Sequence, residues 1–131
     1  MNEFIFLTLA EIIEIHQNQL DLYGGKPGLR DMEMLQSALS QPQATFQGDY
    51  LHGDLSMKAA AYAFHISQNQ PFIDGNKRTG LAAALVFLEL NGIEILDQDQ
   101  KLYDGMMKLA TGNLDKEGFA QILKSLINKS D

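Results

Sequence analysis

The sequence lacks several features that would place it in common structural classes. It contains no cysteine, which excludes disulfide bonds and thiolate zinc sites and fits a reducing cytoplasm. Its longest apolar run, Leu81 to Leu88, is far shorter than the roughly 20 residues needed to cross a bilayer. The segment from Met1 to Leu9 has no basic start typical of a secretory signal. We therefore expect a soluble, cytoplasmic protein without a membrane partner.

Basic residues are also scarce. The chain has 10 Lys and Arg against 17 Asp and Glu, for a formal net charge of -7 at pH 7. A general nucleic-acid-binding protein needs a basic surface that displaces counterions from phosphates, so this class is excluded. The exception is local, because Lys77 and Arg78 are the only two basic residues that are adjacent in the sequence.

The length and composition indicate one domain. With 131 residues, of which 45% are apolar, the chain can bury a single core, and the absence of repeats and linkers predicts one domain over residues 1–131. Capping residues, apolar periodicity and Gly or Pro breaks predict an all-α bundle of six helices. The expected helices run from Thr8 to Gly24, Asp31 to Pro42, Asp54 or Ser56 to Gln70, Lys77 to Asn91, Leu102 to Ala110 and Lys116 to Ile127.

The helix from Lys77 to Asn91 is apolar on nearly every face, which predicts a buried helix at the centre of the bundle. Two shorter segments lie outside the helical pattern. Residues Phe4 to Phe6 are compatible with a short edge strand. From Gln43 to Gly53 the periodicity fails, and we expect a flap there, a loop or short hairpin that covers another part of the molecule.

The most informative feature is a polar loop that leads directly into the apolar helix. A helix N-terminus presents unpaired backbone N–H groups and the positive end of its dipole, and both attract anions. Gly75 lets the backbone approach a ligand closely. Lys77 and Arg78 add two cations, and arginine can bind phosphate oxygens through two parallel hydrogen bonds. Asp74 is a carboxylate that can hold Mg²⁺ together with phosphate oxygens, so the loop predicts a polyphosphate site.

A purely structural interpretation stays open on composition and spacing alone. Asp74 followed by Gly75 and Asn76 is also ordinary chemistry for the start of a helix, and Lys77 with Arg78 can form a solvated first turn. The segment is not a Walker phosphate loop, because its glycines are not followed by Lys and then Ser or Thr. Short patterns of this kind therefore fit a phosphate site and a helix cap equally well.

The segment as a whole resembles the signature of the Fic/Doc family, His-Pro-Phe-x-Asp-Gly-Asn-(Gly or Lys)-Arg. It matches at every position except the first and reads Gln70-Pro71-Phe72-Ile73-Asp74-Gly75-Asn76-Lys77-Arg78. The likeness covers most of the chain and is specific. Further segments that resemble the Doc (death-on-curing) branch are Gly24–Gly25, Gly28–Asp31, Leu35–Leu39, Pro42–Phe46 and Leu85–Gly92.

The resemblance implies a helical bundle in which the motif runs from a loop into the central helix. It associates Asp74 with Mg²⁺, and it associates the part of the flap around Gln43 to Tyr50 with positioning of the target. The residues that it assigns to the phosphates of ATP are Gly75, Asn76, Lys77 and Arg78, and the catalytic positions that it implies are Gln70, Asp74 and Arg78. Adenylylating relatives carry glycine where Lys77 stands. The Doc branch instead transfers the γ-phosphate of ATP to a hydroxyl of elongation factor Tu and blocks translation.

Gln70 stands where the family has a histidine, the general base that takes the proton from the attacking hydroxyl. An amide does not titrate near neutral pH, and loss of a positioned base typically lowers a rate by roughly 10²- to 10⁴-fold. We therefore expect a chain that binds ATP and Mg²⁺ but transfers phosphate poorly. Gln70 is compatible both with a natural degenerate homologue and with a substitution introduced to silence a toxin.

Three functions stay open on these grounds. The first is a Doc-like toxin kinase of a type II toxin–antitoxin system that is disabled at Gln70. The second is a pseudoenzyme that binds nucleotide without turnover, and the third is a protein adenylyltransferase. Toxins of this type are neutralised by a Phd-like antitoxin whose disordered segment folds into a groove beside the active site. His16, His52 and His65 lack metal-ligand spacing, so we expect them to be structural, and only His16 has a position from which it could face the cleft.

Overall fold

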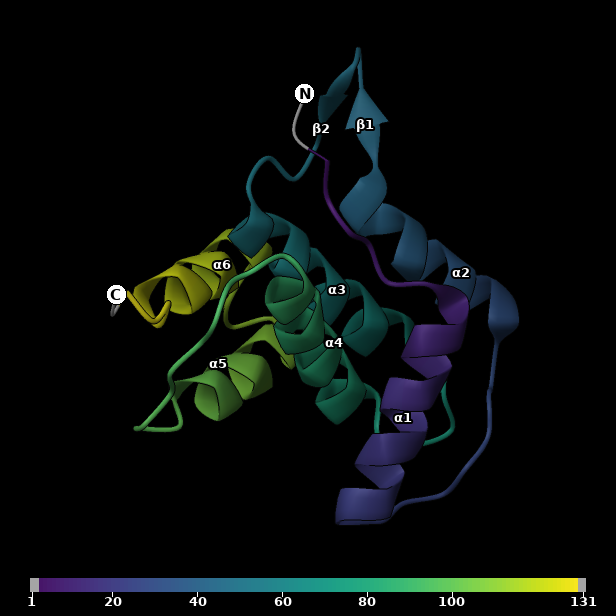
Figure 1. Ribbon diagram of the computed structural model, residues 1–131. Helices are drawn as coiled ribbons and strands as arrows, with labels where there is room; N and C mark the ends of the chain where they lie inside the picture. Colours follow the sequence, from purple (N-terminus) through teal and green to yellow (C-terminus); the bar gives the residue numbers. More distant parts are fainter. Residues whose placement is uncertain (1–2, 130–131) are drawn as a thin grey trace.

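The computed structural model describes residues 3–129 and has the expected all-α architecture (Figure 1). Met1, Asn2, Ser130 and Asp131 lie outside this part, as does the start of the segment tested for a secretory signal. No helix within residues 3–129 has the length and apolar character that crossing a membrane requires. The elements are α1 (Leu9–Tyr23), α2 (Met32–Ser40), the 3₁₀ turn η1 (Gln41–Gln43), β1 (Thr45–Phe46), β2 (Asp49–Tyr50), α3 (Leu55–Asn69), α4 (Asn76–Leu90), α5 (Lys101–Ala110) and α6 (Lys116–Ser125).

Several helices begin where a side chain accepts hydrogen bonds from the first turn. Thr8 and Glu11 form the expected capping box of α1, because the Glu11 N–H donates to Thr8 Oγ1 at 3.1 Å and the Thr8 N–H donates to Glu11 Oε1 at 2.9 Å. Asp31, Asp54 and Asp115 cap α2, α3 and α6 in a similar way. Each cap satisfies N–H groups that have no partner within the helix.

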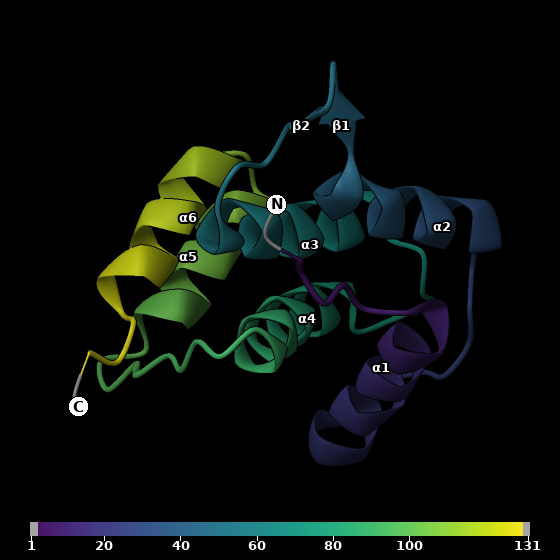
Figure 2. The same ribbon diagram turned by 45° about the horizontal axis from the view of Figure 1, so that its top comes forward.

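Helices α3 and α4 lie side by side at the centre, and the others pack around them (Figures 1 and 2). Helix α4 is the apolar central helix that the sequence predicts, and α3 shares this position because its residues Ala59 to Ala63 are fully buried. The two helices approach most closely at Gly80, where a Cβ atom would lie 2.9 Å from the carbonyl oxygen of Ala63. Helices α2 and α6 pack against α3, α1 packs against α4, and α5 contacts both central helices.

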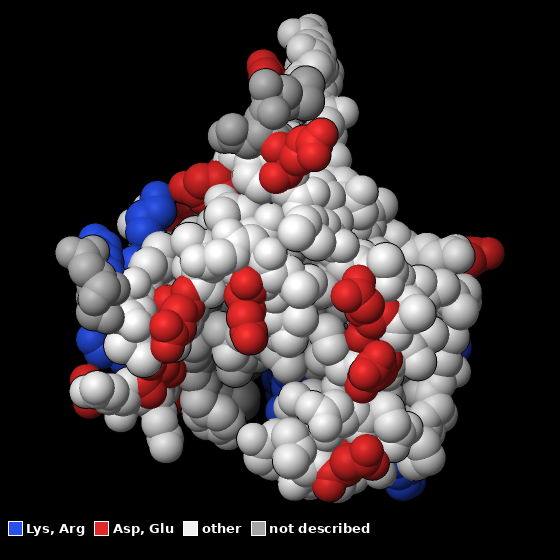
Figure 3. Space-filling view, viewed as in Figure 1, with Lys and Arg blue, Asp and Glu red and all other residues white. Residues whose placement is uncertain are grey.

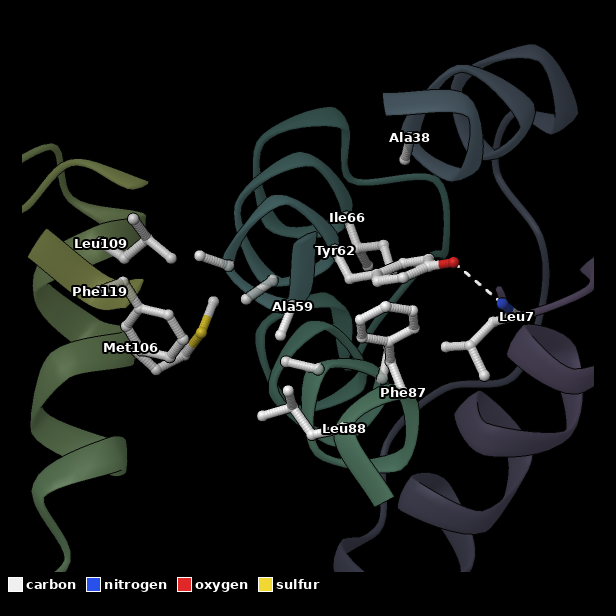
Figure 4. Packing of buried hydrophobic residues seen from close by; sticks show 14 of the residues in the cluster. Leu7, Ala38, Ala59, Tyr62, Ile66, Phe87, Leu88, Met106, Leu109 and Phe119 are labelled. Atoms are coloured by element: carbon white, nitrogen blue, oxygen red, sulfur yellow. Dashed lines mark hydrogen bonds between the residues drawn. The ribbon is translucent and has the colours of Figure 1, made fainter. Parts of the chain in front are cut away.

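Large side chains fill the core between these helices (Figure 4). The ring centroids of Tyr62 on α3 and Phe87 on α4 lie 5.2 Å apart, and both side chains are fully buried. Burying one such side chain contributes roughly 1.5–3 kcal/mol. The Tyr62 hydroxyl accepts a hydrogen bond from the backbone N–H of Leu7 at 2.9 Å, which ties the N-terminal segment to α3.

The expected edge strand at Phe4 to Phe6 was wrong, because no part of this segment is a strand. The side chain of Asn91 supplies both of the partners that a neighbouring strand would offer. It donates to the carbonyl oxygen of Ile5 and accepts from the Ile5 N–H, both at 2.9 Å. Since one amide satisfies both backbone groups, the segment is held extended without a second strand.

The last helix also ends earlier than the sequence predicts, at Ser125 rather than Ile127. Residues 126–128 instead pair with residues 94–96, and Ile127 forms an isolated antiparallel bridge with Ile95. Because the backbone groups of residues 126–128 find partners in residues 94–96, the helix ends before them.

The flap, for which we expected a loop or a short hairpin, is a short hairpin formed by β1 and β2. Its turn has positive φ at both central residues, Gln47 and Gly48, which is the geometry that two-residue hairpin loops favour. The base of the hairpin is held by Lys58, which is fully buried and donates to the carbonyl oxygens of His52 at 2.6 Å and Gly53 at 3.0 Å. This contact orients the flap relative to α3.

Candidate functional site

The motif from Gln70 to Arg78 connects α3 to α4, and its first half is fastened to the chain before α2. The carbonyl oxygen of Pro71 accepts from the N–H groups of Arg30 at 2.6 Å and Asp31 at 3.0 Å. The Ile73 N–H donates to the carbonyl oxygen of Gly28 at 3.0 Å. These backbone bonds act like a short two-stranded ladder, so the loop has a defined position before any ligand is considered.

Gln70, the residue at the family's histidine position, has a left-handed backbone with φ 46° and ψ 56°. Its carbonyl oxygen accepts from Arg30 Nε at 2.6 Å, and the carbonyl oxygen of Asn69 accepts from Arg30 Nη2 at 2.8 Å. A non-glycine residue in this conformation costs about 1–2 kcal/mol. Such strain is concentrated at functional sites, where the surrounding structure maintains it. The Gln70 side chain is exposed at the end of α3.

We expect Gln70→Gly to raise the free energy of unfolding by about 0.5–1 kcal/mol, because glycine has no Cβ penalty in this conformation. Urea denaturation followed by circular dichroism measures this change. Gln70→Ala is the matched control, since it removes the same side chain and keeps the Cβ atom. A Gly variant no more stable than the Ala variant would show that Arg30 holds the residue without strain.

The side chain of Asn76 holds the turn between α3 and α4 through two hydrogen bonds to the backbone of Phe72. Its side-chain amide donates to the carbonyl oxygen of Phe72 at 2.9 Å and accepts from the Phe72 N–H at 3.0 Å. Phe72 is 3% exposed and is therefore fixed in the core. Because the Asn76 amide makes one hydrogen bond at each end, its side chain is fixed against Phe72, and its backbone N–H belongs to the first turn of α4.

The Asp74 carboxylate is ionised and held in one orientation. The Lys26 N–H donates to Oδ2 at 3.1 Å, and the Gly75 N–H donates to Oδ1 at 2.9 Å. These two bonds, with a smaller contribution from the charge of Arg78, hold the pKa of Asp74 below its usual value. Gly25 is needed for this approach, since a Cβ atom there would lie 2.9 Å from Asp74 Oδ2.

The start of α4 differs from the starts of the other helices. Gly75 precedes it with φ 79° and provides no side-chain cap. Even α5 has an acceptor, because Asp97 accepts from the N–H groups of Lys101 and Leu102. Among residues 3–129, α4 is thus the α-helix whose first turn meets no side-chain acceptor. Its N–H groups are free to bind an anion from outside the chain.

Two cations flank this uncapped turn. Lys77 is exposed, whereas Arg78 is half-buried. Arg78 Nη2 donates to the carbonyl oxygen of Gly24 at 3.1 Å, and its guanidinium carbon lies 5.5 Å from the centroid of the Tyr23 ring. The end of α1 therefore orients the guanidinium beside the turn, and its other N–H groups can bind an oxyanion.

The turn opens into a cleft of about 700 Å³ between α1, α4 and α5. Figure 3 shows a hollow between α1 and α5 with Lys or Arg side chains inside it, on a face that otherwise carries many acidic groups. One wall is the polar turn. The opposite wall is mainly apolar and consists of Leu81, Ala82, Leu85, Tyr103, Met106 and Met107. This combination suits a ligand with a charged end and a flat apolar end.

The structure brings together Asp74, Gly75, Asn76, Lys77 and Arg78 around this cleft, whereas Gln70 is not among its lining residues. The sequence pattern did not predict that the Tyr23 ring and the α5 residues Tyr103, Met106 and Met107 line the cleft. Within residues 3–129 no three histidine or acidic side chains come together as a metal site. A divalent cation would therefore need Asp74 together with oxygen ligands from a bound phosphate or water.

The remaining histidines lie elsewhere. His52 Nε2 and His65 Nε2 lie 3.2 Å and 3.1 Å from Lys116 Nζ. Burial, followed by the charge of Lys116, lowers the pKa of His65 to about 4, and the same two causes lower the pKa of His52. Both rings are thus neutral acceptors for one ammonium group. Neither lines the cleft, in keeping with the expected structural role.

Comparison with known proteins supplies the deciding observation. The profile of the Fic/DOC family matches residues 6–88, which include the whole motif. The chain belongs to the Fic/Doc family. It is 38% identical over 101 residues to Toxin Doc of Mycolicibacterium smegmatis, which covers 75% of this chain and 77% of that protein. It is 31% identical over 125 residues to Protein kinase doc of Escherichia phage P1, which covers 95% of this chain and 98% of that protein.

These relatives place the chain in the Doc branch of the Fic/Doc family, among phosphotransferase-type enzymes. Residues 74–78 of the motif line the cleft, whereas residues 70–73 do not. Gln70 is the one departure from the signature.

Proposed function

We propose that this chain is a Doc-type toxin whose cleft binds ATP with Mg²⁺. In the proposed reaction the γ-phosphate is transferred to a hydroxyl of a protein target, elongation factor Tu by resemblance, and translation stops. We further propose that a Phd-like antitoxin binds a groove beside the site, as expected for a type II toxin–antitoxin system. Gln70 leaves this particular chain with a weakened transfer step.

The observation that carries the proposal is the uncapped start of α4 beside an ionised carboxylate. Asp74 is charged and its two oxygens each accept a single backbone bond, so each has a lone pair left for a cation. The residues of the uncapped first turn, Asn76 to Arg78, line the same cleft. A Mg²⁺–polyphosphate complex matches this pairing, because the cation meets the carboxylate and the phosphates meet the N–H groups.

In such a reaction, different residues of the chain bind the phosphates and accept the proton. Arg78 and Lys77 balance the charge of the phosphates, and Arg78 is oriented for this by Gly24 and Tyr23. When bound, Mg²⁺ would supply further charge neutralisation on the phosphate oxygens. The residue at position 70 has to receive the proton of the attacking hydroxyl, and Gln70 has no group that accepts it near neutral pH.

Gln70 also favours a second candidate function, a pseudoenzyme that holds nucleotide or a partner without turnover. Binding groups and base are separate in this site, since the cleft is lined by residues 74–78 and not by Gln70. Loss of the base can therefore leave binding intact. Adenylylation is a further alternative, and by resemblance Lys77 weighs against it.

Binding of Mg²⁺–ATP to the unchanged chain tests the proposal. We expect heat of binding in isothermal titration calorimetry and a Kd about 10- to 150-fold weaker in Arg78→Ala, which removes charge-assisted hydrogen bonds to phosphate. Lys77→Ala should weaken binding less, because an exposed ammonium acts mainly as a point charge.

The matched control is Lys124→Ala, which makes the same change in net charge at an exposed salt bridge between α6 and Asp54. It should leave the Kd unchanged, and thermal melts should show that all variants are folded. Absence of binding by the parent chain would overturn the proposed function. An unchanged Kd in Arg78→Ala would place the phosphates elsewhere.

A further inference from the structure

His16 is the buried titratable group closest to the motif that the proposed function does not use. It lies on α1, is 5% exposed, and does not line the cleft. Its Nε2 atom lies 2.8 Å from the carbonyl oxygen of Asp74. Since a carbonyl oxygen can only accept, we infer that Nε2 carries the hydrogen. The sequence pattern placed His16 on the apolar side of a helix and did not predict this contact.

The hydrogen bond acts on the peptide group at the centre of the turn. Because a peptide unit is planar, a fixed Asp74 carbonyl also fixes the N–H of Gly75 on the other side of the bond. That N–H donates to Asp74 Oδ1 at 2.9 Å, so the carboxylate orientation depends on the same peptide. Without His16, the carbonyl oxygen would lose its partner and the peptide could rotate.

A second contact holds the imidazole in the position from which it donates. The His16 ring is stacked on Phe72, with 3.7 Å between ring centroids and 6° between their planes. Phe72 is itself held by both ends of the Asn76 amide. His16 therefore touches the turn at two points, one before and one after Ile73, and neither His16 nor Phe72 lines the cleft.

We propose that His16 is a positioning residue for the phosphate-binding turn and acts through its hydrogen bond to the Asp74 carbonyl. This inference rests on the proposed function. The bond from α1 holds the Asp74–Gly75 peptide so that the carboxylate is placed for the Mg²⁺ ion, and the first N–H groups of α4 for the phosphates, of one bound Mg²⁺–ATP complex. The ring stack on Phe72 keeps the donor aligned.

Two substitutions separate the hydrogen bond from the ring. His16→Phe keeps an aromatic ring against Phe72 and removes the donor. His16→Gln removes the ring and keeps an N–H, because glutamine Nε2 reaches about the same place as imidazole Nε2. We expect the Kd for Mg²⁺–ATP to rise about tenfold in His16→Phe and to stay within about threefold of the parent in His16→Gln.

Tyr62→Phe is the matched control, because it removes one buried side-chain bond to the backbone, the one from Leu7, away from the turn. It should lower the Tm and leave the Kd unchanged. Amide exchange at residues 75–78 should become faster in His16→Phe and not in Tyr62→Phe. If the role of His16 is purely structural, His16→Phe and Tyr62→Phe should lower the Tm by similar amounts, and neither should change the Kd.

The outcomes separate this inference from the proposed function. A parent chain that does not bind Mg²⁺–ATP overturns the proposed function and this inference with it. If the parent chain binds Mg²⁺–ATP, two results overturn the inference and leave the proposed function intact. These are a Kd of His16→Phe equal to that of the parent, or a Kd of His16→Gln tenfold weaker than that of the parent. Should His16→Phe not fold, NMR of the parent decides instead. The His16 Nε2–H should exchange slowly and shift when Mg²⁺–ATP binds, and its fast exchange with no shift would overturn the inference.

Discussion

Gln70→His is expected to raise the rate of phosphate transfer by about 10²- to 10⁴-fold, the range that a positioned general base contributes. An imidazole titrates near neutral pH and can take the proton of an attacking hydroxyl, which the amide of Gln70 cannot do. The backbone at this position is held by Arg30 through the carbonyl oxygens of Asn69 and Gln70. A new side chain is therefore presented on an unchanged backbone.

Transfer is measured with ATP labelled at the γ-phosphate or at the α-phosphate, in a translation extract and with elongation factor Tu as protein substrate. We expect label from γ-labelled ATP on the protein, arrested translation and toxicity on expression. Label from α-labelled ATP would show adenylylation instead. Gln70→Asn is the control, since it changes the side chain without adding a base. A histidine variant with no transfer of either label would contradict the proposed reaction.

Gly80→Val is expected to lower the free energy of unfolding by about 3 kcal/mol or more, a large part of the 5–15 kcal/mol typical of a domain. A Cβ atom at this position would lie 2.9 Å from the carbonyl oxygen of Ala63 and 3.4 Å from its Cα atom. Both are backbone atoms, so α3 and α4 have to move apart. That movement also separates Gln70, at the end of α3, from the turn that begins α4.

Urea denaturation measures this effect, and two alanine substitutions provide a matched comparison. Gly80→Ala and Gly105→Ala both add one methyl group inside a helix and gain about 1 kcal/mol of helix propensity. A Cβ atom at Gly105 would meet Ile122 Cδ1 at 3.0 Å, the flexible end of a side chain. We expect Gly105→Ala to stay within about 1 kcal/mol of the parent and Gly80→Ala to be less stable. Equal stabilities would show that α4 can shift freely.

The features that the sequence predicted correctly are those decided within a few residues. Thr8 and Glu11 are three residues apart and form the predicted capping box, and Asp31 and Asp54 cap the helices that follow them. The grouping of Asp74 to Arg78 around one cleft follows for the same reason, since these residues are contiguous in the sequence, and their role as a site stays a prediction.

The features that the sequence did not predict depend on partners far along the chain. The strand expected at Phe4 to Phe6 is replaced by bonds to Asn91, 86 residues from Ile5. Local propensity carried no information on that amide, because a strand and an amide side chain satisfy the same backbone groups. No sequence pattern singled out the buried Lys58, and its contacts with the base of the flap appear only in the folded chain.

By itself the sequence determined the all-α class, the helix starts and the cations at the start of α4, because caps, periodicity and motifs act over one or two turns of chain. Tertiary structure decided which groups make those residues a site. His16 reaches Asp74 across 58 residues and Arg30 reaches Gln70 across 40, and part of the apolar lining, Tyr103, Met106 and Met107, comes from α5. Such contacts exist only once α1, α3, α4 and α5 are packed, since helix packing sets the distances between side chains that are remote in the chain.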